Sequence, residues 1–235
     1  LTAFDVGQGN AVLVETPNFR LLYDTGPAYS PESDGGSRVI VPYLRARGIT
    51  RLDALVISHS DLDHAGGART LMDALDIGWI ASSLPESNRL VDARHVGCVA
   101  GQRWARDGVA FEFLHPLSGD GATAKPNARS CTLKITVGAQ SVLLTGDIEA
   151  PQERALLARS RERLRADVLL APHHGSGTSS MPEFLDAVQP QLALFQLGYR
   201  NRYRHPKPEV VERYNARGIR VLRSDRTGAV TLHLD

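Results

Sequence analysis

Ser58-His59-Ser60-Asp61-Leu62-Asp63-His64-Ala65-Gly66-Gly67 is the segment that decides the fold of this chain. Two imidazoles and two carboxylates, at positions 59, 61, 63 and 64, fall within six residues, directly after the apolar run Leu55-Val56-Ile57. Buried histidines and aspartates are costly without partners, so this density indicates a functional site and not an incidental polar loop. A site at the carboxyl end of a strand is typical of α/β folds.

Two further apolar runs end in residues of the same kind. Val142-Leu143-Leu144-Thr145-Gly146-Asp147 ends in a carboxylate, and Val168-Leu169-Leu170-Ala171-Pro172-His173-His174 ends in two histidines. Each signal alone is weak, because an isolated Thr-Gly-Asp is more often a turn. Three strands that all end in ligand residues can converge on one or two divalent metal ions, which activate water for hydrolysis.

The periodicity of apolar residues predicts alternating strands and helices over one domain, 1–235. Strands are expected at 2–6, 11–15, 20–24, 54–58, 78–81, 109–114, 131–137, 141–145, 167–170, 192–195, 219–222 and 229–234, and helices at 37–47, 66–75, 151–164, 182–188 and 208–217. The second half repeats the order of the first. We therefore expect the α/β class, with two mixed sheets packed face to face and helices on the outer faces, an αββα sandwich.

The three motifs resemble the metallo-β-lactamase superfamily. More narrowly, they resemble the carboxy-terminal domain of the ComEC family of competence channels, which import single-stranded DNA. Further matches lie at Asp5–Ala11, Leu22–Gly26, Tyr203–Pro206 and Ser224–Ala229, so the resemblance spans essentially the whole chain.

The resemblance also implies a cellular setting. In that family the hydrolase-like domain follows a membrane-spanning part and lies outside the cytoplasmic membrane, so the implied partners are the membrane channel and other domains of the same polypeptide. The chain starts at Leu1 inside a strand-like run, and we expect it to be a piece of a longer membrane protein, monomeric as an isolated domain. No apolar run in it approaches the ~20 residues that span a bilayer.

The resemblance assigns roles to individual residues. It implies that the metal ligands are His59, Asp61, Asp63, His64, Asp147 and His173. Asp147 is then expected to bridge two ions, with His59 and Asp61 on one ion and Asp63, His64 and His173 on the other. His173 is favoured over His174 as the ligand. Asp24 and His174 are expected to support the ligands from behind by hydrogen bonds.

Two departures from the superfamily pattern bear on the metal. Asp61 stands where the superfamily usually has a second histidine, and the segment Asn127-Ala128-Arg129-Ser130 lacks the separate histidine expected before the Thr-Gly-Asp strand. One of the two ion sites is therefore poorer in ligands. Replacing imidazole by carboxylate makes the site richer in oxygen, which favours Mn²⁺, although Zn²⁺ still competes.

Basic residues concentrate near the carboxyl end. Residues 200–226 carry nine Arg or Lys and three acids, a net charge of +6, while the rest of the chain sums to −5. Such a segment suits a polyanion such as DNA, with contacts expected from Arg200, Arg202, Arg204 and Lys207. The alternative interpretation is a solvated, arginine-rich surface. His205 is expected to protonate or stabilise the leaving oxygen, and Asp63 to orient the attacking water as well as bind metal.

Cys98 and Cys131 are the only cysteines, and no Cys-x-x-Cys pair is present, so a cysteine-built zinc site is excluded. Two buried thiols are the favoured state. One disulfide is the alternative, and it requires an oxidising compartment.

Three functions fit these observations. The first is a metal-dependent nuclease that cleaves DNA, which the resemblance implies would degrade the strand that is not imported. The second is a non-catalytic domain that binds DNA or gates the channel, an interpretation kept open by the missing histidine. The third is a phosphodiesterase that acts on cell-surface phosphodiesters. A plain β-lactamase is disfavoured, because its site relies on histidines that this chain has replaced.

Overall fold

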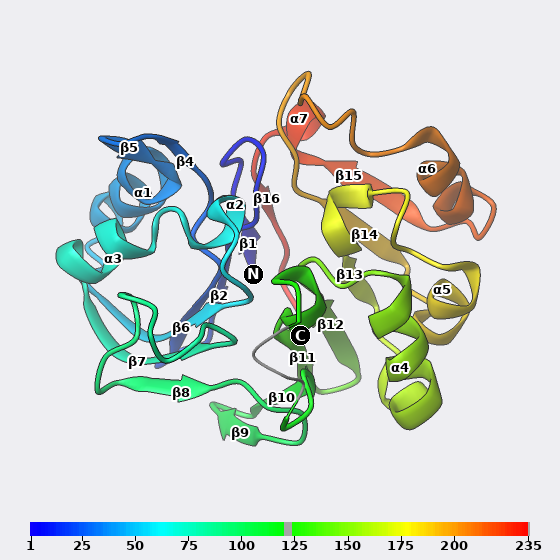
Figure 1. The fold of residues 1–235 in the computed structure, drawn as a ribbon, viewed down its shortest axis with the longest axis horizontal. Coiled ribbons are helices and arrows are strands. Elements are labelled where there is room, and N and C mark those ends of the chain that lie inside the picture. Colours follow the sequence, from blue (N-terminus) through cyan, green and yellow to red (C-terminus); the bar gives the residue numbers. More distant parts are fainter. Residues whose placement is uncertain (120–123, 235) are drawn as a thin grey trace.

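Two mixed sheets of seven strands each pack face to face in the computed structural model, which describes residues 1–119 and 124–234 (Figure 1). Helices cover the two outer faces, so the expected αββα sandwich is confirmed. No helix in the described part of the chain combines the length and the apolar character that crossing a bilayer requires.

The first sheet has the strand order β16-β1-β2-β3-β6-β7-β8. Neighbours are antiparallel from β16 to β3 and parallel from β3 to β8. The bounds are β1 (Thr2–Ala3), β2 (Val12–Glu15), β3 (Arg20–Tyr23), β6 (Arg51–Ile57), β7 (Asp76–Ser82), β8 (His95–Gly97) and β16 (Val230–Thr231). The chain therefore closes on itself, because its last strand lies beside its first (Figure 1).

The second sheet repeats this plan in the order β15-β14-β13-β12-β11-β10-β9. Neighbours are antiparallel from β9 to β12 and parallel from β12 to β15. The bounds are β9 (Arg103–Arg106), β10 (Val109–His115), β11 (Thr132–Val137), β12 (Gln140–Leu144), β13 (Val168–Leu170), β14 (Leu192–Phe195) and β15 (Arg220–Arg223). A small hairpin of β4 (Ala28–Ser30) and β5 (Ser33–Asp34) stands apart.

Helices follow the parallel strands, where a crossover connection is required. In the first half these are α1 (Val41–Ala46), which continues a π-helical turn, α2 (Leu62–Ala65) and α3 (Ala68–Ala74). In the second half they are α4 (Ala150–Ser160), α5 (Pro182–Val188), α6 (Pro208–Asn215) and α7 (Ser224–Thr227). Short 3-10 turns occupy Asn127–Arg129, Arg161–Arg163 and Pro172–Gly175.

Alternate side chains of each central strand enter different cores. In β12, Val142 and Leu144 face the core between the sheets, whereas Leu143 faces α4 and α5. In β3, Tyr23 faces the inter-sheet core and Leu22 faces the helices of the first half. A strand buried on both faces needs apolar residues throughout, which explains why the three motif strands read as continuous apolar runs.

Several expected elements differ from the observed ones. The strand expected at 2–6 is confined to Thr2–Ala3, and the helix expected at 66–75 corresponds to α3 alone, because the separate short helix α2 that precedes it was not predicted. Strands β4, β5, β8 and β9 and helix α7 were not predicted. These strands are two to four residues long and largely polar, so they lack the apolar alternation by which strands are recognised.

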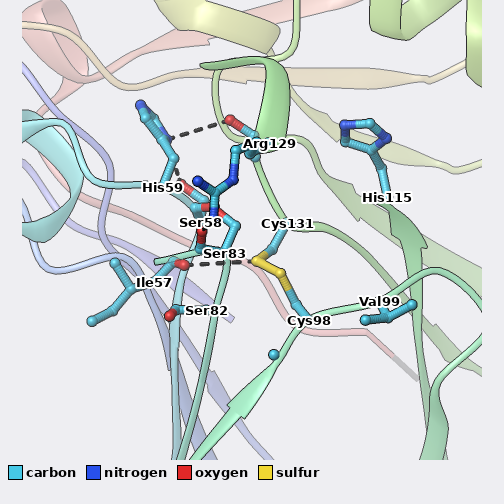
Figure 2. Close-up of a disulfide and its surroundings, with 12 residues drawn as sticks. Ile57, Ser58, His59, Ser82, Ser83, Cys98, Val99, His115, Arg129 and Cys131 are labelled. Carbon is cyan, nitrogen blue, oxygen red and sulfur yellow. Dashed lines mark hydrogen bonds between the residues drawn. A yellow bond between two sulfur atoms is a disulfide. The ribbon is translucent and has the colours of Figure 1, made fainter. Parts of the chain in front are cut away.

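The two cysteines are joined in a disulfide, so the favoured expectation of two thiols is wrong (Figure 2). Cys98 follows β8 at the edge of the first sheet and Cys131 precedes β11 in the second sheet. The bond therefore links the two sheets. The residues are 33 positions apart, and only the fold brings their Cα atoms to 6.0 Å.

Candidate metal centre

The ligand loop after β6 changes conformation at Asp61. Asp61 has extended backbone angles (φ −69°, ψ 146°), and α2 begins at the next residue. Asp63 and His64 are therefore both helical. The effect is to turn both side chains toward the second sheet, where they meet Asp147 and His174.

The two glycines after α2 allow the backbone to approach another segment closely. A Cβ atom on Gly66 would lie 2.2 Å from the backbone nitrogen of Ala28, and one on Gly67 would lie 2.4 Å from the carbonyl oxygen of Thr25. Any side chain here would push the ligand loop away from the segment after β3. Close packing of two backbones is therefore the reason for glycine at both positions.

Four ligand atoms from three chain segments converge at the junction of the sheets. One atom from each of Asp63, His64, Asp147 and His174 lies within 4.8 Å of all the others; we call these residues the ligand group. His64 Nε2 is 3.1 Å from Asp147 Oδ1 and 3.2 Å from His174 Nε2, and His174 Nε2 is 3.3 Å from Asp63 Oδ2. Two imidazoles and two carboxylates with this spacing have the chemistry of a divalent metal site.

Each histidine of the ligand group is oriented by a hydrogen bond on its far side. His64 Nδ1 donates to Asp24 Oδ2 at 2.8 Å, and His174 Nδ1 donates to the carbonyl oxygen of Gln196 at 2.7 Å. Asp24 also accepts hydrogen bonds from the backbone and side chain of Ser58. With Nδ1 protonated, each Nε2 atom presents a lone pair to the centre, as metal-ligating histidines do.

The carboxylates of the ligand group are stabilised by nearby positive charge. Burial alone would raise the pKa of Asp63, but the hydrogen bond from His174 and the charges of the two histidines lower it to about 2. Burial would likewise lower the pKa of His64, but the charges of Asp147 and Asp24 outweigh burial and raise it well above its usual value. The buried carboxylates are thus balanced by protons on the histidines, and a divalent cation would supply the same charge.

His59 and Asp61 form a second, poorer set of donors beside the ligand group. His59 Nε2 is buried and makes no hydrogen bond within the described structure, and it lies 3.6 Å from Asp61 Oδ2. Its other nitrogen contacts the hydroxyls of Ser58 at 3.0 Å and Ser130 at 3.3 Å. A buried imidazole nitrogen without a hydrogen-bond partner is suited to bind a cation. Asp147 Oδ1 is also buried without a hydrogen bond, which fits a carboxylate shared between two positions.

The adjacent histidines after β13 lie in different surroundings. Both have positive φ angles, 50° for His173 and 53° for His174. His174 is fully within the ligand group, although it was expected in a supporting role. His173 is 22% exposed in its side chain, with Nε2 3.6 Å from Asp147 Oδ2 and Nδ1 3.3 Å from Glu149 Oε1.

A loop after β14 borders the site; residues 199–207 are called the basic loop. Asn201 closes it, because its side chain accepts from the His205 amide and donates to the His205 carbonyl. Arg200 and Arg204 have positive φ angles, which are uncommon for residues other than glycine. The two hydrogen bonds of Asn201 therefore stabilise an unfavourable backbone conformation. The loop brings the His205 ring to 5.8 Å from the His173 ring, between their centroids.

His205 is neutral near pH 7. Burial, with the neighbouring charges of His173, His174 and Lys207, lowers the pKa of His205 to about 4. Its Nδ1 atom is buried and has no hydrogen bond within the described structure.

Only part of the basic segment 200–226 faces the site. Arg213, Arg217 and Arg223 are engaged in structural contacts with carbonyl groups or carboxylates. In contrast, the four predicted DNA contacts, Arg200, Arg202, Arg204 and Lys207, form no ion pair with any carboxylate in the described part of the chain; where they have partners, these are tyrosines of the same loop.

Three supporting residues were not identified from the sequence. Ser130 Oγ accepts from the Asp147 amide and contacts His59, Gln196 orients His174, and Glu149 contacts His173. None belongs to a recognisable motif. Ser130 lies in the segment where the sequence showed only that a histidine was missing.

The chain is similar to known proteins along its length. A family profile described as "Metallo-beta-lactamase superfamily" matches residues 4–198. The competence protein ComA of Neisseria gonorrhoeae is 41% identical over 234 residues, which cover 100% of this chain and 32% of that protein. The ComE operon protein 3 of Bacillus subtilis (strain 168) is 33% identical over 251 residues, which cover 96% of this chain and 32% of that protein. The chain thus spans about a third of these relatives.

Similarity to solved structures concerns the fold. The metallo-beta-lactamase fold protein YhfI from Bacillus subtilis matches with a TM-score of 0.60 and 14% identity, over 98% of this chain and 99% of that one. At this identity, the shared property is the sandwich itself.

Proposed function

Because this chain belongs to the metallo-β-lactamase superfamily of metal-dependent hydrolases, we propose that it is a nuclease that cleaves phosphodiester bonds of DNA. The observation that carries the proposal is the position of the ligand group, next to a cleft that the basic loop borders. Carboxylates and imidazoles bind the cation, and arginines without carboxylate partners are available to phosphates. A polyanionic phosphodiester satisfies both requirements.

We assign the principal ion to Asp63, His64, Asp147 and His174, with His59, Asp61 and a shared Asp147 as the poorer second position. This replaces His173 by His174 among the expected ligands. When bound, a divalent cation supplies a nucleophile by lowering the pKa of water and neutralises charge on the phosphate. Counting both positions, carboxylates and imidazoles contribute equally, and a set with this share of oxygen ligands favours Mn²⁺ more than a thiolate- or imidazole-based zinc site does.

The protein groups around the metal centre have distinct tasks. Asp63 is 28% exposed in its side chain, unlike the fully buried His64, so it can also accept a hydrogen bond from an attacking water. His205, being neutral near pH 7, is assigned to stabilise the leaving oxygen by donating a hydrogen bond rather than to act as a charged acid. Asp24 fixes the imidazole of His64 and does not touch the substrate.

The biological setting is part of the proposal. One relative is named as a competence protein and another as a ComE operon protein, and each is about three times as long as this chain. We propose that residues 1–235 form a single domain of a longer membrane protein that takes up DNA, and that it degrades the strand that is not imported. The disulfide supports a place outside the cytoplasm, since such bonds persist in oxidising compartments.

The test is a cleavage assay with the purified chain. End-labelled linear single-stranded and double-stranded DNA are incubated with Mn²⁺, Mg²⁺, Zn²⁺ or EDTA, beside an Asp63→Ala, Asp147→Ala variant. We expect cleavage that requires metal, is best with Mn²⁺ and is lost in the variant. Metal content is measured on the same samples.

Other outcomes would favour other functions. Salt-sensitive DNA binding without cleavage in any metal would contradict the nuclease and favour a binding or gating domain. Turnover of a small phosphodiester such as bis(4-nitrophenyl) phosphate, with DNA left intact, would favour a phosphodiesterase of cell-surface substrates.

A further inference from the structure

A cleft of about 770 Å³ adjoins the metal centre and is not explained by metal binding. One wall comes from the first half of the chain, at Gly7, Gln8 and Tyr29, and the other from the basic loop, at Tyr199 and Tyr203. Asp61 and Asp63 line the same cleft, together with Leu62. A ligand in this cleft therefore lies against the carboxylates that are assigned to the metal.

Exposed apolar side chains gather at this one place. Of the six large apolar side chains that are exposed in the described structure, four line the cleft: Tyr199 (72% exposed), Leu62 (69%), Tyr203 (44%) and Tyr29 (43%). Tyrosine rings and a leucine exposed together are unfavourable in water, and clusters of this kind mark binding sites. Three flat aromatic rings indicate a ligand that has flat faces itself.

Each of the three tyrosines has a guanidinium group over its ring. Arg38 lies 5.4 Å from the centroid of Tyr29, Arg200 lies 5.3 Å from that of Tyr199, and Arg202 lies 4.8 Å from that of Tyr203. Tyr203 also stacks on His205, with an angle of 14° between the ring planes. Aromatic rings beside arginines form the surface on which proteins stack the bases of single strands while binding their phosphates.

We propose that this cleft binds unpaired nucleobases, with Tyr199 and Tyr29 as stacking surfaces and Arg200 and Arg202 on the backbone phosphates. The ligand class is single-stranded polynucleotide, because the bases of a duplex are stacked on each other and cannot lie between side chains without being unpaired. The proposal rests on the proposed nuclease function and narrows its substrate. Bases held here place an adjoining phosphate at Asp61 and Asp63.

Base stacking is separated from phosphate binding by comparing two strands of equal charge. Fluorescence anisotropy measures binding of labelled oligothymidine and of an abasic strand of the same length, in EDTA so that neither is cleaved. We expect the wild type to bind oligothymidine more tightly. Tyr199→Leu keeps an apolar side chain without a π face, and it should lose roughly 5- to 100-fold in affinity for oligothymidine. Tyr199→Phe keeps the ring and should retain that affinity.

The abasic strand provides the internal control, since Tyr199→Leu should bind it as the wild type does. Equal binding of both strands by the wild type, or of neither, would overturn the proposal, as would a Tyr199→Leu variant that keeps the preference for bases. Cleavage with Mn²⁺ is scored separately. A wild type that prefers bases but cleaves nothing contradicts the nuclease alone, and one that cleaves without preferring bases contradicts the stacking site alone.

Discussion

Two adjacent histidines of this chain differ in almost every physical respect. His174 is buried, its Nδ1 is fixed by the Gln196 carbonyl, and its Nε2 lies between the carboxylates of Asp63 and Asp147. His173 is partly exposed and its nearest charged neighbour on the Nδ1 side is Glu149. Successive residues with positive φ project their side chains in different directions, so one turn provides one ligand and one residue for the rim of the site.

Substituting the two histidines separately should therefore give unequal effects on metal binding. His174→Ala removes a donor from the ligand group, and we expect the Mn²⁺ affinity to fall by roughly 100-fold or more, beyond the effect of losing a supporting residue. His173→Ala should change the affinity by less than about 10-fold. Isothermal titration with Mn²⁺ and elemental analysis measure both. A larger loss in His173→Ala than in His174→Ala would reverse the assignment.

Gly9 shows how a residue outside the three ligand motifs shapes the site. Its φ is 148°, and a Cβ atom there would lie 2.2 Å from the carbonyl oxygen of Asp63. That oxygen also accepts a hydrogen bond from the amide of Asn10. The Gly7–Asn10 turn therefore packs directly against the backbone of α2 and fixes where Asp63 stands.

Gly9→Ala should consequently weaken metal binding as well as folding. We expect a loss of about 1–3 kcal/mol in unfolding free energy from overpacking, together with a reduced Mn²⁺ affinity because α2 must shift. Gly48→Ala is the matched control, since Gly48 also has positive φ (69°) but open space around it. It should lose stability from backbone strain and keep its metal affinity. If both variants bind Mn²⁺ like the wild type, the contact with Asp63 has no role in the site.

At the scale of elements, the segment after the His173-His174 turn is held by two helices. Glu153 of α4 accepts hydrogen bonds from the amides of Ser180 and Met181, at 2.6 and 2.7 Å. Arg213 of α6 donates to the carbonyl oxygens of Ser179 and Ser180. The turn that carries His174 is thus anchored through residues 179–181 to α4 and α6.

This anchor should make stability depend on pH. Burial raises the pKa of Glu153 from 4.5 to about 7, partly offset by the two amide hydrogen bonds. Between these values the folded protein keeps a proton that the unfolded chain has released. The contribution of Glu153 to the free energy of unfolding is therefore full below about pH 4.5. It is lost as the pH rises to about 7, and the loss amounts to at most about 3 kcal/mol.

Glu153→Gln removes this titration. Its unfolding free energy should fall less between pH 5 and pH 8 than that of the wild type, although it is lower at pH 5 because the amide cannot accept both backbone hydrogen bonds. Urea denaturation at several pH values measures the slope. Glu162→Gln, on the exposed turn after α4, should keep the wild-type slope. Equal slopes in Glu153→Gln and the wild type would show that Glu153 does not titrate in this range.

Elements with a clear pattern of apolar residues were predictable from the sequence. Elements that form only because of neighbouring segments were not. The motif strands β6, β12 and β13 are buried on both faces, so their sequences identify them whatever surrounds them. Strand β8 has the sequence His-Val-Gly and exists because it adds to the edge of a sheet that other residues build. The break between α2 and α3 depends on where Thr25 and Ala28 lie, which no local pattern in 62–75 reveals.

At the scale of the whole molecule, the ligands of the metal centre come from both halves of the chain. Motifs located Asp63, His64 and Asp147, because each lies in the loop or first turn after a buried apolar strand. The sequence favoured His173 over His174, and it could not show the Gln196 carbonyl after β14 that orients His174 toward the other ligands. It also did not reveal the aromatic cleft, whose walls lie more than 150 residues apart, at Tyr29 and Tyr199.

The disulfide is a covalent cross-link between the two sheets, and it lies near Ser58 and His59 at the start of the ligand loop (Figure 2). The amide of Cys131 donates to the carbonyl of Ser58, and its own carbonyl accepts from the hydroxyl of Tyr23 at 2.6 Å. The preceding residue, Ser130, contacts both His59 and the amide of Asp147. Cys131 therefore ties the second sheet to the base of the ligand loop.

Removing the bond should destabilise the protein and loosen the poorer metal position first. Because the cysteines are 33 positions apart, losing this constraint on the unfolded chain should lower the unfolding free energy of Cys98→Ser, Cys131→Ser by about 3–4 kcal/mol. A reducing agent should produce the same loss in the wild type and none in the double variant, which separates the bond from any effect of the serines. The ligand group is held by Asp24 and Gln196, so it should still bind one Mn²⁺, while binding at His59 and Asp61 weakens. Equal stability of the reduced and oxidised wild type would mean that the two sheets hold together without the link.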